Sequence, residues 1–447
     1  MIRTSSLTRT ARRTVAGALA AILTGSAAAA DPAADRAAGI RREAARIESQ
    51  VIAWRRDIHQ HPELSNREFR TARLVADHLE SLGMEVRREI AHTGVVGVLR
   101  GGRPGATVAL RADMDALPVT EAVDVPFASV ERATYLGREV GVMHACGHDA
   151  HTAILLGVAD VLASLSESLP GTILFVFQPA EERPPPGEKG GAELMLAEGV
   201  FDDPAPDAVF ALHAVPQQRA GEVAYRAGGV MASSDTLAIT VRGRQTHAAY
   251  PWDGVDPIAA AARIVTAIES IPARQVDVRI PGVVSIGSIH GGVRHNIIPE
   301  EVELLGTIRS LGPDHRTALH RHVREVAEGI ARSTGAEADV RIELGYPVTV
   351  NDPALTARML PTLERVAGPE NVIEGIARTG GEDFSFFAER VPGLYLWLGV
   401  RPRDVEREAA APNHSPRFFV DESALVLGVR LMAGLASDYL ALESTSD

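Results

Sequence analysis

The chain has 447 residues, of which 45% are hydrophobic and 23% charged, and its formal net charge is −13. This length exceeds that of one ordinary domain, so we expect two domains with a substantial apolar core. The acidic balance argues against nucleic acid and against an anionic membrane surface as binding partners.

The first thirty residues have the pattern of a signal peptide. Four arginines between Arg3 and Arg13 precede an apolar stretch at 14–24, and small residues at 28–30 offer a cleavage site. The apolar stretch is too short to span a membrane. We therefore expect residues 1–30 to be removed and the protein to be exported, to the periplasm or the medium, with no membrane attachment afterwards. The pair Arg12-Arg13 leaves both the general and the twin-arginine export route open.

Three apolar runs each lead into side chains that bind metals or transfer protons. The predicted strands and the residues that follow them are 107–110 before Asp113 and Asp115, 171–177 before Glu181 and Glu182, and 207–212 before His213. Ligands bind beyond the carboxyl ends of parallel strands, so one edge of an α/β sheet should carry all of these groups. We predict a larger catalytic α/β domain whose mixed sheet is flanked by helices.

The pattern changes near residue 229. A strand–helix–strand–strand–helix–strand order follows over roughly a hundred residues and predicts a small ferredoxin-like α+β domain. We place this domain at residues 229–345, as an insertion between two parts of the catalytic domain, 31–228 and 346–447.

Cys146 is the only cysteine, so the chain has no internal disulfide. It lies between His144 and His148, and a cysteine and a histidine two residues apart can bind one metal. Further along the chain, Glu182, His213 and His414 offer enough ligands for two divalent cations that share the Cys146 thiolate.

Two such cations can polarise an amide carbonyl and lower the pKa of a shared water to about 7. Glu181, next to the candidate ligand Glu182, would then accept the proton of that water. Asp113 and Asp115 are either ligands or acceptors that hold a ligating histidine in one tautomer. We favour the second role for Asp113 and count Asp115 with the catalytic group.

Several motifs together resemble the amidohydrolase branch of the aminoacylase- and carboxypeptidase-type dinuclear metallopeptidases, which includes hippurate hydrolases and indole-acetyl-amino-acid hydrolases. The motifs are HACGHD at 144–149, RADMDALP at 111–118, QPAEE at 178–182, GEDF at 381–384 and NHSP at 413–416. The resemblance implies that Cys146, His148, Glu182, His213 and His414 are the metal ligands and that Glu181 is the general base. It implies two divalent ions per subunit, zinc or manganese foremost, with cobalt or nickel as alternatives.

The resemblance also gives meaning to the inserted domain, which would be a lid that carries a homodimer interface. His247 would stabilise the tetrahedral oxyanion, often in the active site of the partner subunit. Asn296 is a candidate substrate contact, and Arg309 a candidate clamp for a substrate carboxylate. The loop 242–246 is bulkier than the glycine-rich version usual in such enzymes, and Trp252 stands where a histidine is common.

The expected function is metal-dependent hydrolysis of the amide bond of an N-acyl amino acid, or a related conjugate, to a carboxylic acid and a free amino acid. One alternative is a dipeptidase or carboxypeptidase on the same scaffold. The other is a periplasmic binding protein without catalysis, against which an intact Glu181 argues because a binding module needs no base.

Overall fold

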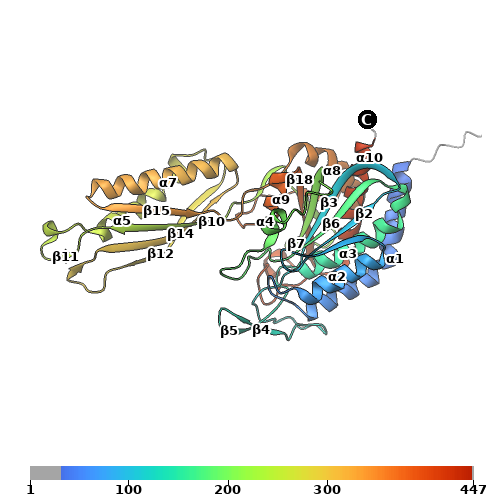
Figure 1. Cartoon of the computed structure of the whole chain (residues 1–447), viewed down its shortest axis with the longest axis horizontal. Helices are drawn as coiled ribbons and strands as arrows, with labels where there is room; N and C mark the ends of the chain where they lie inside the picture. The colour runs from blue at the N-terminus through green and yellow to red at the C-terminus, as the bar shows by residue number, and fades with distance from the viewer. Residues whose placement is uncertain (1–31, 445–447) are drawn as a thin grey trace, which may run out of the picture.

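The computed structural model describes residues 32–444, and the predicted signal peptide lies outside them. The described chain is elongated, with a larger body that contains both chain ends and a smaller domain that projects from it (Figure 1). The smaller domain is formed by the middle of the chain, and the larger body by the segments before and after it.

The larger body is built on an eight-stranded mixed sheet in the order β1-β2-β6-β3-β7-β18-β8-β17. Its four central strands are parallel, and they are β6 (Pro170–Gln178), β3 (Arg103–Asp113), β7 (Ala208–Arg219) and β18 (Gly393–Arg401). The flanking strands are β1 (Glu85–Ile90), β2 (Gly94–Arg100), β8 (Val223–Tyr225) and β17 (Val372–Glu374). The predicted α/β class and mixed sheet are confirmed.

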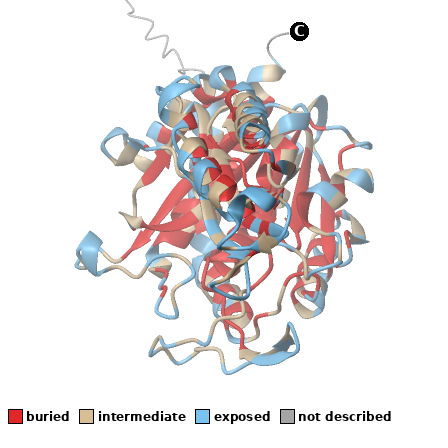
Figure 2. Cartoon of the chain, turned by 90° about the vertical axis from the view of Figure 1, so that its left-hand side faces the viewer, coloured by how far each residue is buried: buried red, intermediate tan, exposed pale blue. Residues whose placement is uncertain are grey.

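Helices cover both faces of this sheet because its strands are apolar on both sides. Successive side chains of a strand point to opposite faces, so Val108 and Leu110 pack into one buried cluster while Ala109 packs into the other. One face is covered by α1 (Pro32–Gln60), α2 (Phe69–Ser81), α3 (His148–Ser164), α8 (Pro353–Ala367) and α10 (Leu425–Glu443). The other is covered by α4 (Gly191–Ala197) and α9 (Phe384–Arg390). Figure 2 shows the buried residues concentrated in the strands.

One helical segment, at 422–443, is long and apolar enough to cross a membrane. However, 72% of its most apolar window is buried inside the protein. Its apolar residues therefore belong to the core beneath the sheet, against α1, α3 and α8.

The smaller domain has a four-stranded antiparallel sheet in the order β12-β14-β10-β15. Its strands are β10 (Asp235–Arg242), β12 (Gly282–Gly291), β14 (Glu301–Ser310) and β15 (Glu337–Glu343), and its helices are α5 (Pro257–Ile268), α6 (Ile271–Arg274) and α7 (Pro313–Ser333). Its core contains residues from 237 to 342 only and is separate from the clusters of the larger body. We keep 229–345 as the proposed extent of this lid domain.

Short pairs of strands complete the structure. They are the hairpin β4 (Arg132–Tyr135) with β5 (Arg138–Gly141), the pair β9 (Gly228–Met231) with β16 (Thr349–Asn351), and the pair β11 (Thr246–His247) with β13 (Ile297–Ile298). The β9–β16 pair lies where the chain enters and leaves the lid domain, and β11 lies at the end of the lid that is farthest from the larger body (Figure 1).

The lid sheet buries one face against its helices and exposes the other, which gives a matched pair of substitutions. Leu304 is fully buried, whereas its neighbour Leu305 is 46% exposed. We expect Leu304→Ala to lower the free energy of unfolding by about 2–5 kcal/mol, because it removes apolar contacts and leaves a cavity. Leu305→Ala should stay within about 0.5 kcal/mol. Denaturant unfolding of both variants checks this, and equal losses would contradict the assignment of the buried face.

Candidate metal centre

The parallel strands bring the predicted carboxylates and His213 to one level of the sheet. Asp113, the last residue of β3, pairs with Gln178, the last residue of β6. β7 pairs with β3 through Arg111 opposite Ala211, which places His213 level with Asp113. We expected the third strand to end before His213, but β7 continues to Arg219. His213 therefore projects from within a strand that extends past the end of β3 and stays paired with β18 up to Arg219.

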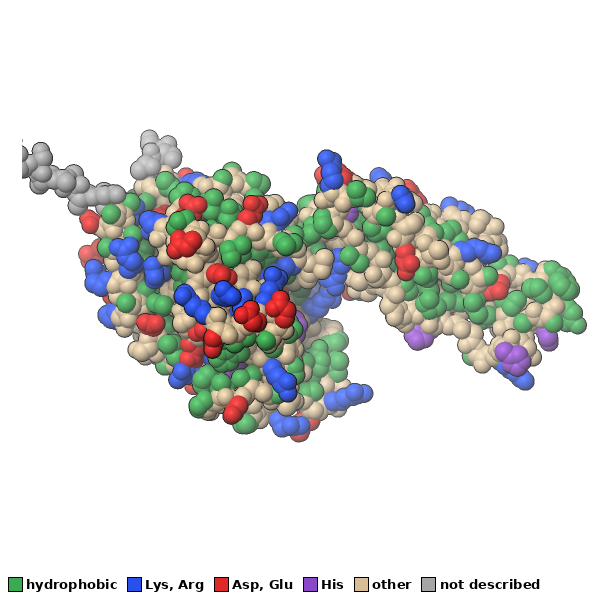
Figure 3. Space-filling model, turned by 180° about the vertical axis from the view of Figure 1, so that it is seen from behind, with side chains coloured by type: hydrophobic (Ala, Val, Ile, Leu, Met, Phe, Trp, Pro, Cys, Tyr) green, Lys and Arg blue, Asp and Glu red, His purple; other side chains and the backbone are tan. Residues whose placement is uncertain are grey.

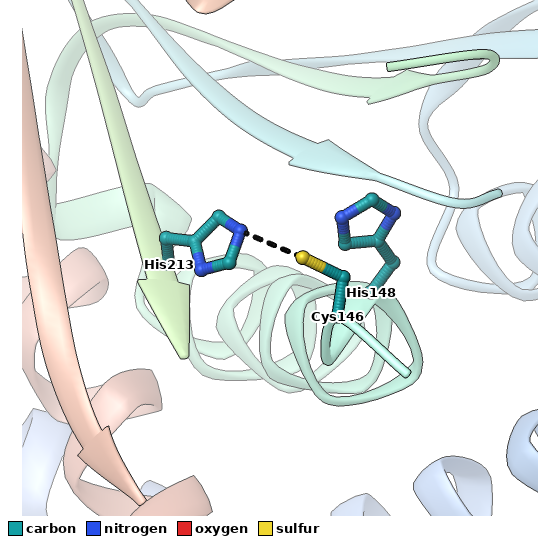
Figure 4. A group of neighbouring side chains, drawn as sticks. All are labelled: Cys146, His148 and His213. Carbon is teal, nitrogen blue, oxygen red and sulfur yellow. Dashed lines mark hydrogen bonds between the residues drawn. The ribbon is translucent and has the colours of Figure 1, made fainter. Parts of the chain in front are cut away.

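The HACGHD segment bends sharply between its cysteine and its second histidine. Gly147 has a φ of +97° and immediately precedes α3, and a Cβ at this position would lie 2.9 Å from the Cβ of Ala214. Only glycine fits such a conformation and such a close approach. The bend turns Cys146 and His148 toward the same space (Figure 4).

Cys146, His148 and His213 form the first group of candidate ligands. Their ligand atoms lie within 4.8 Å of one another, and the Sγ of Cys146 is 3.4 Å from the Nε2 of His213. His148 donates from Nδ1 to the backbone oxygen of Asp115 at 2.8 Å, and His213 donates from Nδ1 to that of Ala214 at 2.9 Å. These bonds leave the Nε2 lone pair of both histidines free, as metal binding requires.

Cys146, Glu182 and His414 form a second group, again with ligand atoms within 4.8 Å of one another. The Nε2 of His414 lies 2.8 Å from Oε1 of Glu182. Because Cys146 belongs to both groups, its sulfur lies between two candidate metal positions. This is the arrangement expected of a bridging thiolate, and all five predicted ligands take part in it.

The charges and the unpaired atoms of the site fit divalent cations. The Nε2 of His148 is buried and has no hydrogen-bond partner among the described residues. Burial raises the pKa of the Cys146 thiol, and the charges of Glu182 and Glu181 raise it further. A nearby cation reverses this effect and stabilises the thiolate. Burial lowers the pKa of His213, which keeps His213 in the neutral form that binds metals.

Asp115 holds the two glutamates and one histidine in place. Its Oδ1 accepts from the backbone nitrogen of Glu181 at 3.1 Å, and its Oδ2 accepts from that of Glu182 at 3.0 Å and from Ser65 at 2.8 Å. Oδ1 also lies 3.2 Å from the Nδ1 of His148. We counted Asp115 with the catalytic group, but these bonds give it a positioning role, because each of its oxygens is occupied within the protein.

Asp113 supports a different histidine from the one expected. Its Oδ1 accepts from the Nδ1 of His151 at 2.6 Å, and the Nε2 of His151 accepts from the backbone nitrogen of Ala214 at 2.7 Å. Both ring nitrogens of His151 are thus used within the protein, so His151 has no lone pair free for a metal. Asp113 steadies the strand beside His213, while Asp115 orients the ligand His148.

Glu181 is buried beside the first ligand group, with Oε2 3.9 Å from the Nε2 of His148. The loop that carries it has left-handed backbone on either side, with φ of +52° at Ala180 and +81° at Arg183. Such conformations cost energy in non-glycine residues and occur where surrounding bonds fix them. Here the bonds to Asp115 and one from the Tyr346 hydroxyl to the Glu181 backbone oxygen, at 2.7 Å, fix the loop.

A cavity of about 630 Å³ opens from this centre toward the lid. It is lined by Glu181, by four of the candidate ligands and by Arg309, which comes from the lid strand β14. His247 and Asn296 do not line it. His247 is exposed in β11, at the far end of the lid, and Asn296 lies beside it, with its backbone oxygen 3.0 Å from the nitrogen of Ala248.

The cavity also contains groups to which we gave no role from the sequence. Asn413 donates to the backbone oxygens of Cys146 at 3.2 Å and Ala214 at 3.1 Å, and so ties the NHSP segment to the metal groups. Its place in a motif was the available signal. Arg183 and Arg378 line the cavity as well, and their surroundings in sequence gave no sign of this, because isolated arginines are usually surface charges.

Comparison with known proteins assigns the family. A family model described as peptidase family M20/M25/M40 matches residues 109–438. This chain belongs to that family.

The relatives fall into two types. Thermostable carboxypeptidase 2 of Saccharolobus solfataricus is 42% identical over 399 residues, which cover 89% of this chain and 97% of the relative. N-acetylcysteine deacetylase of Bacillus subtilis is 35% identical over 389 residues, which cover 87% and 96%. A solved Bacillus subtilis structure, described as a dinuclear metal-binding peptidase of the family, is 33% identical with a TM-score of 0.74 over 88% of this chain and 99% of that one. The protein is thus a hydrolase of amide bonds in a metal-binding family.

The shared position of Cys146 makes it the most sensitive ligand. We expect Cys146→Ser to lose most of the bound metal and most of the activity together, because a neutral hydroxyl is a much weaker ligand than a thiolate. Metal content per subunit, measured by elemental analysis after dialysis, checks this. His92→Ala, at an exposed histidine remote from both groups, is the control and should keep its metal. Full metal content in Cys146→Ser would contradict the bridging role.

Proposed function

We propose that this protein is an exported amidohydrolase that cleaves the amide bond of N-acyl amino acids, releasing a carboxylic acid and a free amino acid. The observation that carries the proposal is the buried carboxylate of Glu181 beside two ligand groups that share Cys146, in a cavity whose lid side holds an arginine. A base, a cation site and a carboxylate clamp are the three requirements of this reaction.

Cys146, His148, Glu182, His213 and His414 would hold two divalent cations, zinc or manganese foremost, with cobalt or nickel as alternatives. Bound there, such cations polarise an amide carbonyl and make water acidic enough to react near neutral pH. The chemistry of the five donors, a thiolate with imidazoles and a carboxylate, suits these metals.

Glu181 takes a proton from the attacking water and passes it to the nitrogen of the leaving amine as the carbon–nitrogen bond breaks. Burial raises the pKa of Glu181, and the negative charges of Glu382 and Glu182 raise it further. A raised pKa suits a group that must hold a proton between the two transfers. Tyr346 and Asp115 fix the backbone of Glu181, so its carboxylate keeps its direction during both steps.

Arg309 is placed to bind the carboxylate of the substrate's amino acid. It is partly buried on the lid strand β14 and lines the same cavity as Glu181. A guanidinium can pair with a carboxylate through two parallel hydrogen bonds, which fixes the direction of the substrate as well as its affinity. The scissile amide would then lie between Arg309 and Glu181.

His247 and Asn296 lie together in the β11–β13 region, at the end of the lid that is farthest from the larger body. We propose that they complete the active site of a second subunit in a homodimer. The side-chain oxygen of Asn296 is buried without a partner among the described residues, and His247 is exposed. His247 is therefore accessible to an incoming substrate, and Asn296 beside it has an acceptor that no described residue uses.

A second candidate is carboxypeptidase or dipeptidase activity, favoured by the Saccharolobus relative at 42% identity. The two reactions differ in the acyl half of the substrate, which is an amino acid or peptide in one case and a simple acyl group in the other. A binding protein without catalysis is the third candidate, and it requires no role for Glu181.

Hydrolysis of a small panel by metal-loaded protein separates these candidates. We expect amine release from N-acetyl amino acids, hippurate or an indole-acetyl conjugate, and loss of this release with a chelator. Cleavage of a plain dipeptide alone would assign the protein to the peptidases. The base is tested in the same assay with Glu181→Gln, which should retain metal but lose at least a hundredfold in turnover, as expected for removal of a general base. A metal-loaded wild type that cleaves nothing would favour the binding protein.

Mixed dimers test the action of His247 across the interface. We expect His247→Ala and Glu181→Gln each to be nearly inactive alone. In a heterodimer, one of the two sites receives an intact Glu181 from one chain and an intact His247 from the other. Activity should therefore recover to about half of wild type per mixed dimer, or about a quarter for a random one-to-one mixture, by subunit counting. No recovery in mixtures shown to exchange subunits would place His247 and Glu181 in the same chain's site.

A further inference from the structure

Three arginines line the cavity that contains Glu181, and none of them forms an ion pair within residues 32–444. They are Arg183, directly after the glutamate pair, Arg309 on the lid strand β14, and Arg378, which precedes the GEDF segment. Seen from behind, the surface is hollowed where the two domains meet, and basic side chains lie along that hollow (Figure 3).

The guanidinium groups of Arg183 and Arg378 contact neutral groups only. Arg183 donates to the hydroxyl of Ser234 at 2.7 Å and lies over the ring of Tyr346. Arg378 donates to the amide oxygen of Gln217 at 3.1 Å and lies over the ring of Trp397.

The guanidinium of Arg309 makes no hydrogen bond within the described chain, and the residue is partly buried. Burial lowers the pKa of Arg309, and the positive charge of Arg183 lowers it further. The two cations therefore repel each other across the cavity, and the negative charge of Asp235 offsets this repulsion only in part.

The carboxylates that line the same cavity are engaged elsewhere. Asp235 is bound by Arg316 at 2.5 Å and His320 at 2.8 Å. Glu382 is bound by Arg111 at 3.0 Å and by the Tyr395 hydroxyl at 2.8 Å. Glu182 is a candidate metal ligand, and Glu181 is the candidate base beside it. The lid side of the cavity thus has positive charge that the chain itself does not balance.

Unbalanced charge in a partly buried cavity costs free energy, which an anionic ligand recovers. One substrate carboxylate can engage one arginine in a bidentate pair, so a single acid group would leave two of the three cations unmatched. We propose that the preferred substrates are dianionic N-acyl amino acids, with a second acid group besides the carboxylate that the hydrolase function requires. This inference rests on the proposed function and narrows its substrate class.

The second acid can belong to the amino acid or to the acyl group, and two matched pairs of substrates distinguish these sources. N-acetylglutamate and N-acetylglutamine have the same shape and differ in charge on the amino-acid side. N-succinylalanine and its terminal amide differ in the same way on the acyl side. We expect kcat/KM to be roughly tenfold or more higher for the acid in one of the pairs, as charge-assisted hydrogen bonds allow. This preference should fall as salt is added.

Arginine variants connect the preference to the cavity. In Arg183→Gln and Arg378→Gln, the ratio of kcat/KM between the acid and the amide should fall severalfold in at least one of the two. The ratio compares two substrates in one protein, so it does not depend on the amount of folded enzyme, and Arg183→Lys and Arg378→Lys should keep part of it. Arg226→Gln is the control, since Arg226 is partly buried, donates to the backbone oxygen of Gly229 and does not line the cavity. Its ratio should stay at the wild-type value.

Equal or higher kcat/KM for the amides in both pairs would overturn the proposal while leaving the hydrolase function intact, because the amides are still cleaved. A preference for the acid that survives all the arginine substitutions would also overturn it. Absence of cleavage of all four substrates and of the other N-acyl amino acids by metal-loaded protein would instead contradict the proposed function itself.

Discussion

A single buried arginine joins the segments on which the whole site depends. Arg111, inside β3, donates to Asp113 at 2.7 Å, to Gln178 at 2.8 Å, and to Glu382 and Asp383 at 3.0 Å each. These partners lie at the ends of β3 and β6 and in the segment before α9. Removing one charged partner of such a buried group lowers the free energy of unfolding by roughly 3–5 kcal/mol, because the remaining charge loses its counter-charge. Through Asp113 and His151, the same network reaches the strand that carries His213.

The site divides into two regions of opposite charge. Around Cys146, the buried carboxylates outweigh the cationic groups, so that His148 has its pKa raised to about 10, although burial alone would lower it. Metal cations suit this region. Toward the lid, the arginines have no carboxylate partner, and an anionic part of a substrate suits them. A substrate with an amide for the metal side and acid groups for the arginine side can bind in one orientation only. Its amide then lies at Glu181 and its acid groups point toward the lid.

The sequence contained enough information to select the five candidate ligands that the structure brings together, because each follows an apolar strand or lies in a compact motif. The mixed α/β sheet and the inserted lid domain were predictable for the same reason. The extent of β7 was not, because its last residues include Pro216 and the polar run 217–219, which are typical of a loop, and the prediction that the strand ended before His213 was wrong. Asp113 was predicted to support a ligating histidine and Asp115 was counted with the catalytic group, but which carboxylate holds which histidine depends on side-chain directions that spacing does not determine. Arg378 gave no signal, because its role depends on the absence of a partner in space.

His247 and Asn296 show how far such reasoning extends. They were singled out in separate motifs, and the structure places them side by side, where His247 pairs with Ile297 across the β11–β13 ribbon. Neither reaches the cavity of its own chain, so a role for one in catalysis requires the same second subunit as a role for the other. The oxyanion contact, the substrate contact and the dimer are therefore one hypothesis, and a monomeric but fully active enzyme would contradict all three together.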